Sequence, residues 1–251
     1  MSRLIKTTGA VLLLLICLAL AAGCGGDTTT ASESTALPRG NTDLMMIDAS
    51  PSFRRSALGF VPDMMTVAKV IGTEGRVLWV GCVDGAPLRT LRWTIRVDFG
   101  ELPPSVENAT GLAERVNTAR ALGLRPRLAR LIRRTPDRVP GSGLLEALEL
   151  AAQTPEVGRV FLFTDALTFE PDSVHLATAN SDQLQATARR WTRRLHGLRG
   201  VEVLMIGVGR EARTSVAVRN AERLFHSVVT GAGGRLRWSQ ELPASFGEAT
   251  S

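Results

Sequence analysis

The run Leu44-Met45-Met46-Ile47-Asp48-Ala49-Ser50-Pro51-Ser52 decides how this chain folds and where its chemistry lies. A short apolar segment ends abruptly at an acid, and two hydroxyl side chains follow at every second position. The apolar segment indicates a buried β-strand. Oxygen side chains that gather where a buried strand ends are suited to a small hard cation such as Mg²⁺.

Strand and helix patterns alternate along the rest of the chain. Further strands are expected near 77–83, 91–98, 160–165, 201–208 and 233–238, and helices near 58–71, 105–135, 144–152, 181–198 and 213–229. The second and third strands are joined by Asp84–Thr90, which is too short for a helical crossover, so these two strands should pair antiparallel. We therefore predict an α/β fold, a three-layer, doubly wound, mostly parallel six-stranded sheet with one antiparallel edge strand and helices on both faces.

The N-terminal part of the chain has the pattern of an export signal. Arg3 and Lys6 precede the apolar run Ala10–Ala22, which is too short to span a bilayer core of about 30 Å but suits a signal peptide. The following Leu20-Ala21-Ala22-Gly23-Cys24 resembles a bacterial lipobox. That resemblance implies cleavage before Cys24 and attachment of lipid, including palmitate, to this cysteine; an ordinary cleaved signal peptide is the alternative.

The chain is accordingly expected to have four regions. These are a lipoprotein signal peptide at 1–23, the lipidated Cys24 with a flexible Gly-, Ser- and Thr-rich tether at 24–40, one folded domain at 41–240 and a C-terminal tail at 241–251. Multiple acyl chains on one cysteine anchor a protein stably to a bilayer. The predicted location is the extracytoplasmic face of a bacterial cell membrane.

The first and fourth predicted strands each end in an aspartate, Asp48 and Asp165 respectively. In a doubly wound sheet, ligands bind at the carboxyl ends of the strands where the strand order reverses, and the common reversal lies between the first and fourth strands. Both carboxylates should face one crevice there, with Ser50 and Ser52 on the loop that leaves the first strand. Ser142, which precedes the helix before the fourth strand, adds another hydroxyl. Helix capping is the alternative role for each of these serines.

With these residues in place, the sequence resembles the von Willebrand factor A-like (VWA) family and its metal-ion-dependent adhesion site (MIDAS). The family's Asp-x-Ser-x-Ser matches residues 48–52, its second-element Thr falls on Ser142, and its Thr-Asp at the end of a strand falls on Thr164-Asp165. The sequence departs from the family pattern in having Ser rather than Thr at 142, and Ala166 where Gly usually follows the aspartate.

The resemblance implies a divalent metal site, most often Mg²⁺, with Mn²⁺ or Ca²⁺ as other occupants. Ser50, Ser52 and Ser142 would contact the metal directly, and Asp48 and Asp165 directly or through water. A protein ligand would complete the metal's shell with an acidic side chain, so the resemblance implies a binding module and not an enzyme. The alternatives are a metal-free scaffold or assembly component of the cell envelope and, more distantly, a hydrolase that uses Ser142.

Other chemistry is poorly supported by the sequence. It contains no G-x-S-x-G or P-loop motif and no Cys/His cluster for zinc, and Cys82 is expected to be a buried strand thiol. The net charge is +6, and arginines crowd 125–134 and 189–199. No nucleic acid partner is expected for an exported, tethered chain, so these arginines are interpreted as solvated faces; contact with anionic lipid head groups or an acidic cell-wall polymer is the functional alternative.

Overall fold

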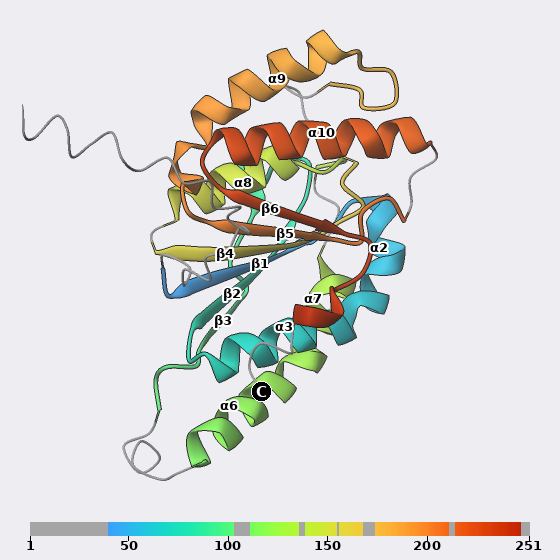
Figure 1. The fold of residues 1–251 in the computed structure, drawn as a ribbon. Helices are drawn as coiled ribbons and strands as arrows, with labels where there is room; N and C mark the ends of the chain where they lie inside the picture. The colour runs from blue at the N-terminus through green and yellow to red at the C-terminus, as the bar shows by residue number, and fades with distance from the viewer. Residues whose placement is uncertain are drawn as a thin grey trace, which may run out of the picture. The chain divides into compact units, whose positions relative to one another are not determined.

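A six-stranded sheet forms the centre of the molecule in the computed structural model (Figure 1). The structure describes residues 40–102, 111–135, 139–154, 156–167, 174–210 and 214–246, and these belong to one compact unit, Pro38–Ser251. The predicted signal peptide and Cys24 lie outside the described residues. The strands are β1 (Thr42–Asp48), β2 (Val77–Val83), β3 (Ile95–Asp98), β4 (Val157–Phe163), β5 (Glu202–Ile206) and β6 (Arg235–Ser239).

The strand order is β3-β2-β1-β4-β5-β6, and only the pairing of β3 with β2 is antiparallel. This arrangement confirms the predicted mixed sheet with one antiparallel edge strand. The order reverses between β1 and β4, because the chain proceeds outward in one direction from β1 to β3 and in the other direction from β4 to β6. The carboxyl ends of β1 and β4 therefore lie side by side at the switch point, where ligands bind in such sheets.

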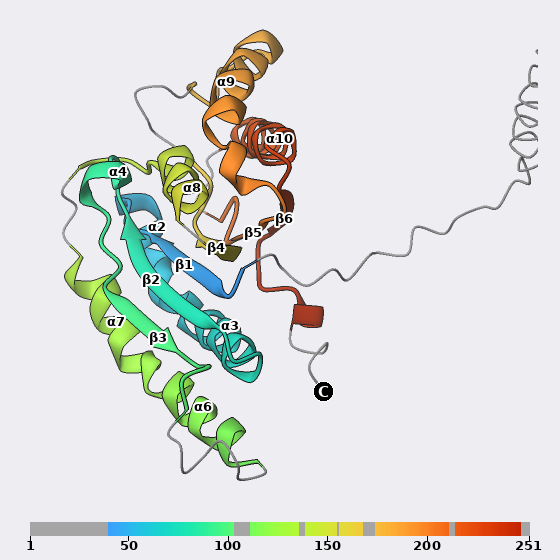
Figure 2. The same ribbon diagram turned by 90° about the vertical axis from the view of Figure 1, so that its left-hand side faces the viewer.

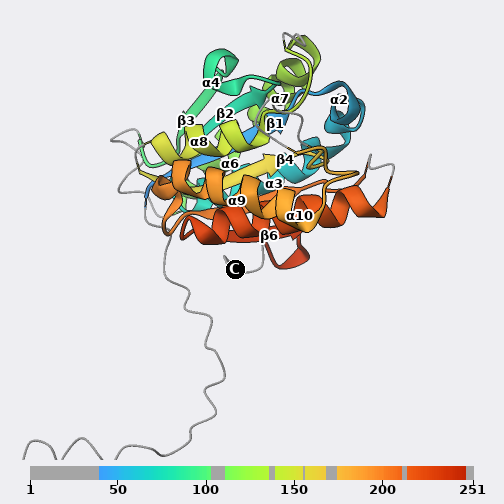
Figure 3. The ribbon, with the colours of Figure 1, turned by 90° about the horizontal axis from the view of Figure 1, so that it is seen from above.

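Helices cover both faces of the sheet, as Figures 2 and 3 show. The helices are α2 (Pro51–Ala57), α3 (Val61–Thr73), α4 (Pro87–Thr90), α6 (Leu112–Leu122), α7 (Leu124–Arg134), α8 (Leu144–Gln153), α9 (Ser181–Arg194) and α10 (Ser215–Gly231), with short 3₁₀ turns at Leu58–Phe60, His196–Leu198 and Ala244–Phe246. Side chains of α2, α3, α6 and α7 fill one core, and those of α8, α9 and α10 fill the other. No helix in the described ranges is both long and apolar enough to cross a membrane.

The central strands supply both cores because their side chains alternate between the two faces. In β1, Leu44 and Met46 pack with α8, whereas Met45 and Ile47 pack with α3. All seven residues of β1 are buried, which explains why this strand shows a continuous apolar run and no alternation of apolar and polar residues. Both cores lie within the compact unit Pro38–Ser251.

Three elements differ from the sequence prediction. The helix expected at 58–71 begins earlier, at Pro51, and is divided by the turn Leu58–Phe60; Pro62 is tolerated because it lies in the first turn of α3. The strand expected at 91–98 starts only at Ile95, since its pairing with β2 ends at Val80. Leu242 and Phe246, in the segment predicted as a tail, pack against the α3 core, and the Phe246 ring meets that of Phe161 edge-on at 5.3 Å.

A charged network closes the amino edge of the sheet, opposite the switch point. Asp43 in β1 is fully buried and accepts hydrogen bonds from Arg76 and Arg159. Arg159 also pairs with Glu74 at the end of α3. Burial lowers the pKa of Arg159, but its hydrogen bonds to Asp43 and Glu74 outweigh burial and hold this pKa above its usual value. Each buried charge at this edge therefore has an opposite charge in contact.

Candidate metal centre at the switch point

Asp48 is the last residue of β1 and lies at the centre of the candidate site. Its side chain is buried, and its Oδ1 accepts a hydrogen bond of 2.8 Å from the backbone N–H of Ser50. This bond fixes the turn between β1 and α2, while Pro51 starts the helix. The Ser50 and Ser52 hydroxyl oxygens lie 3.2 Å apart. Ser50 occupies the N-cap position of α2 without a side-chain capping bond, so its hydroxyl does not serve the capping role considered above.

Ser142 reaches the same carboxylate from a distant part of the chain. Its Oγ lies 3.0 Å from each carboxylate oxygen of Asp48 and donates its proton to them. The adjacent Gly143 holds this loop close to the β2–α4 connection, because its N–H donates to the Asp84 carbonyl at 2.8 Å. A Cβ at 143 would lie only 2.2 Å from Cδ of Pro87, so the loop requires glycine there.

The end of β4 supplies the third part of the site. Thr164 is fully buried, and its hydroxyl donates to Oδ2 of Asp48 at 2.7 Å while accepting from the N–H of Ala166 at 3.0 Å. Asp165, which is also buried, accepts a bond of 3.0 Å from the N–H of Leu167. Ala166 has a φ of 62°, a left-handed conformation that glycine adopts more easily than alanine.

The structure thus brings Ser50, Ser142 and Asp165 together around Asp48, with Ser52 beside Ser50. Sequence reasoning missed the part played by Thr164, which was noted only as the neighbour of Asp165. Its signal was the Thr-Asp pair at the strand end. Because its oxygen already donates to Asp48 and accepts from Ala166, we interpret Thr164 as a residue that positions the carboxylate.

The site concentrates negative charge in a buried position. The pKa of Asp48 is raised to about 6, mainly by burial and then by the nearby charge of Asp165, although hydrogen bonds from Ser50 and Thr164 lower it. Unlike Asp43, Asp48 takes part in no ion pair with a lysine or arginine among the described residues. A cation bound beside these two carboxylates would relieve this electrostatic strain.

The donor set fits a hard divalent cation. Two carboxylates balance a double positive charge, and the hydroxyl of Ser142 directs its proton to Asp48, which leaves oxygen lone pairs for a ligand. In the described ranges no cluster of three or more His, Cys, Asp or Glu side chains is placed to hold a metal, so soft-metal sites such as zinc have no support there. Hydroxyl oxygens must therefore supply much of any coordination.

Cys82 is poorly suited to act as a nucleophile. It lies in β2, and burial raises its pKa to about 11, although a hydrogen bond with Thr135 and the charge of Arg54 lower it. At neutral pH the thiol is protonated and therefore a weak nucleophile. Cys82 lies in a strand as predicted, but the residue is only partly buried.

Comparisons with known proteins show similarity in structure alone. No protein-family model and no curated protein sequence matches the chain. Among solved structures, a D319A mutant of the PilB minor pilin from Streptococcus sanguinis aligns with a TM-score of 0.43 at 9% identity, covering 84% of this chain and 60% of the pilin chain. The human COPII-coat protein Sec24c aligns with a TM-score of 0.41 at 10% identity, covering 83% of this chain and 31% of Sec24c. The chain thus spans less than two thirds of either protein. The fold itself is of the α/β class.

Proposed function

We propose that this chain is a VWA-like binding module that engages a protein partner through a divalent cation. The observation that carries the proposal is the meeting of three separate motifs at one buried carboxylate. Ser50 from the β1–α2 turn, Ser142 from the loop before α8 and Thr164 from the end of β4 all donate to Asp48. Capping or turn roles for each residue separately would give no reason for this convergence at the switch point.

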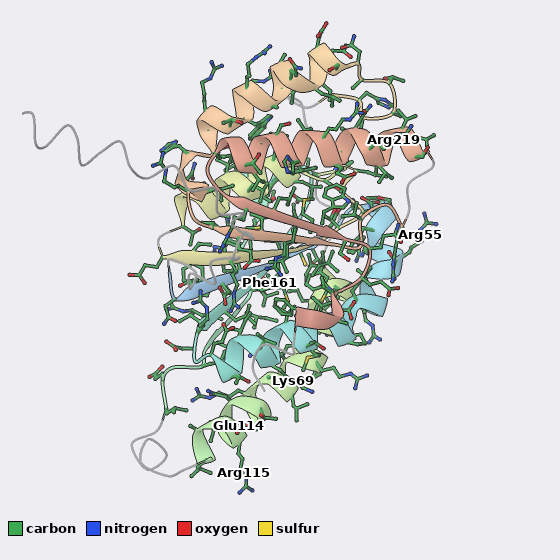
Figure 4. All side chains as sticks on the ribbon, viewed as in Figure 1. Arg55, Lys69, Glu114, Arg115, Phe161 and Arg219 are labelled. Carbon is green, nitrogen blue, oxygen red and sulfur yellow. The ribbon has the colours of Figure 1, made fainter. Side chains whose placement is uncertain are left out.

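A divalent cation held by these residues would keep a coordination position for a ligand from outside the chain. Mg²⁺ takes six oxygens in near-octahedral geometry and keeps several waters. With Ser50, Ser52, Ser142, Asp48 and Asp165 as donors, at least one position stays open, and a partner's Asp or Glu is suited to it. Arg55 lies exposed at this edge of the molecule, less than one turn after Ser52, and Figure 4 shows it pointing away from the sheet. Its positive charge favours an acidic partner.

Substitutions at Ser142 test the metal site directly. In the soluble unit, residues 38–251, we expect Mg²⁺ or Mn²⁺ to bind saturably and raise the melting temperature, because a ligand that binds only the folded state stabilises it. Ser142→Ala removes a ligand oxygen and should weaken binding about 10-fold or more. Ser142→Thr keeps the oxygen and should bind at least as tightly as the wild type. Isothermal titration calorimetry measures all three affinities.

A metal-free scaffold is the second candidate, and one observation favours it. Asp48 accepts hydrogen bonds from Ser50, Ser142 and Thr164 of the chain itself, so its oxygens are satisfied by protein donors. In a metal-free scaffold, the hydrogen bonds from these hydroxyls to Asp48 would hold the ends of β1 and β4 together. Wild-type protein that shows neither saturable binding nor thermal stabilisation with Mg²⁺, Mn²⁺ or Ca²⁺ would decide for this candidate.

We propose further that lipid on Cys24 holds the domain at the extracytoplasmic face of the membrane. The support is the N-terminal sequence pattern. In a bacterial host that processes lipoproteins, the full chain should incorporate labelled palmitate and sediment with membranes, whereas Cys24→Ser should do neither. A Cys24→Ser chain that still takes up label would contradict the anchor; Cys82→Ser serves as the matched control and should label like the wild type.

A further inference from the structure

A groove of about 670 Å³ lies between α9 and α10, which run side by side in Figures 1 and 2. Three arginines converge on it: Arg189 and Arg193 from α9, and Arg223 from α10. The remaining wall consists of hydroxyl, amide and small apolar side chains, namely Ser181, Leu184, Gln185, Ala188, Thr192 and Ser227. The groove therefore combines positive charge, hydrogen-bonding groups and a limited apolar surface.

The two helices approach closely at one end of this groove. A Cβ at Gly231 in α10 would lie 3.0 Å from the hydroxyl oxygen of Thr192 in α9. On the inner side of α9, Leu184, Ala188 and Trp191 pack into the core. These contacts fix the groove walls on rigid helices, so the positions of the three guanidinium groups do not depend on a loop.

The groove arginines differ from their neighbour Arg194. Arg194 pairs with Glu149 of α8 and lies 4.0 Å from the centre of the Trp191 ring, so its charge is compensated within the fold. None of the ion pairs formed among the described residues involves Arg189, Arg193 or Arg223. Three like charges around one groove repel one another. An anionic ligand in the groove would be attracted by all three and would offset their mutual repulsion.

The groove runs along α9 from Ser181 to Arg193, and its Arg193 end lies toward the edge of the sheet where β1 begins. The chain returns from the C-terminal end of α9 to the start of β5, and from the C-terminal end of α10 to the start of β6, so both helices end at the amino edge. Gly40, which precedes β1, lies at the same edge and lines a small cavity together with Arg199. The candidate metal centre lies at the opposite, carboxyl edge.

We propose that the α9–α10 groove binds the phosphate head groups of anionic phospholipids in the membrane that anchors the chain. Guanidinium groups bind phosphate through paired N–H donors, and each basic residue near an anionic bilayer strengthens attachment. The domain would then rest on the bilayer through its amino edge and present the metal centre to partners outside. This inference rests on the proposed membrane location but not on metal binding.

Vesicle binding by residues 38–251, which lack any lipid anchor, tests the groove separately from the anchor. Sedimentation with vesicles of phosphatidylglycerol and phosphatidylcholine should show binding that pure phosphatidylcholine vesicles do not support and that high salt abolishes. Replacing Arg189, Arg193 and Arg223 with Gln should weaken binding at least about 10-fold. The matched control replaces Arg125, Arg127 and Arg130 of α7 with Gln, removes the same charge and should change binding less than about two-fold.

Several outcomes would overturn the proposal. The proposal fails if the groove variant binds anionic vesicles as tightly as the wild type does. It also fails if the α7 control loses as much affinity as the groove variant, or if the wild type does not bind anionic vesicles. Tight binding of glycerol phosphate or a soluble phosphodiester polymer that displaces the vesicles would assign the groove to a soluble anion instead. Circular dichroism spectra and melting temperatures that match the wild type confirm that the groove variant is folded.

The orientation of the domain on the vesicle surface can be measured independently by fluorescence. In a Cys82→Ser background, an environment-sensitive fluorophore at Gln185→Cys, in the groove, should shift to shorter wavelength when anionic vesicles are added. The same fluorophore at Arg55→Cys, near the metal centre, should not shift. A shift at Arg55→Cys alone would place the opposite edge on the membrane and overturn the proposal.

Discussion

Replacing Asp48 with Asn is expected to stabilise the metal-free domain by about 3 kcal/mol at pH 7.5. In the folded protein the pKa of Asp48 is raised from 3.8 to about 6, first by burial and second by the charge of Asp165. Keeping this carboxylate ionised in the fold is therefore unfavourable at neutral pH. Asparagine fills the same space without charge, and its oxygen can still accept from the N–H of Ser50. The hydroxyls of Ser142 and Thr164 can rotate to accept from the new amide.

The pH dependence follows from the sign of the shift. Because the folded-state pKa of Asp48 lies above the unfolded value, the folded state binds the proton more tightly. Stability is lost as pH rises from about 4 to about 6, and the full loss persists above that range. The stability difference between Asp48→Asn and the wild type should therefore be near zero at pH 4 and reach its full size above about pH 6.5.

Urea unfolding of residues 38–251 in chelator, repeated from pH 4 to 8, measures this difference. The exposed Glu222→Gln variant removes one surface charge and should follow the wild type within about 0.5 kcal/mol. Adding Mg²⁺ at pH 7.5 should stabilise the wild type and have little effect on Asp48→Asn, since the variant lacks one of the two charges that attract the ion. A destabilising effect of Asp48→Asn, or one that does not vary with pH, would contradict the electrostatic account.

Much of this candidate site could be predicted from the sequence, because the apolar runs show where the two strands end. The apolar run before Asp48 and the one before Asp165 each end in an acid, and the topology of a doubly wound sheet places those two ends together. The hydrogen bond from Thr164 to Asp48 could not be predicted in this way. It depends on the rotamer of one side chain and on the left-handed turn at Ala166, neither of which leaves a periodic pattern.

The amino-edge network was also missed, for a different reason. Asp43 and Arg159 lie 116 residues apart, and Arg76 stands just before β2, where a polar residue is ordinary. Only the parallel register that pairs Asp43 with Arg159 across β1 and β4 brings the charges into contact. A sequence pattern shows that strands are buried, but it does not show which polar residues meet at their buried ends.

Loss of the Asp43 carboxylate is expected to be the most destabilising single change at the amino edge. Asp43→Ala should lower the free energy of unfolding by about 3–5 kcal/mol, because two buried guanidinium groups then share only the partly exposed carboxylate of Glu74. The side chains of Arg76 and Arg159 are only 10% and 7% exposed, so water cannot replace the missing partner. Denaturant unfolding with chelator present gives the value directly.

Two comparisons make this expectation specific. Glu241 forms an ion pair with Arg210, and its side chain is 78% exposed. Glu241→Gln breaks this pair and should lower the free energy of unfolding by less than about 1 kcal/mol. Because Asp43 lies at the edge opposite Asp48, folded Asp43→Ala protein should bind Mg²⁺ or Mn²⁺ as tightly as the wild type does. An Asp43→Ala effect no larger than that of Glu241→Gln would mean that the buried arginines find solvent or other partners, and that the network does not hold the amino edge together.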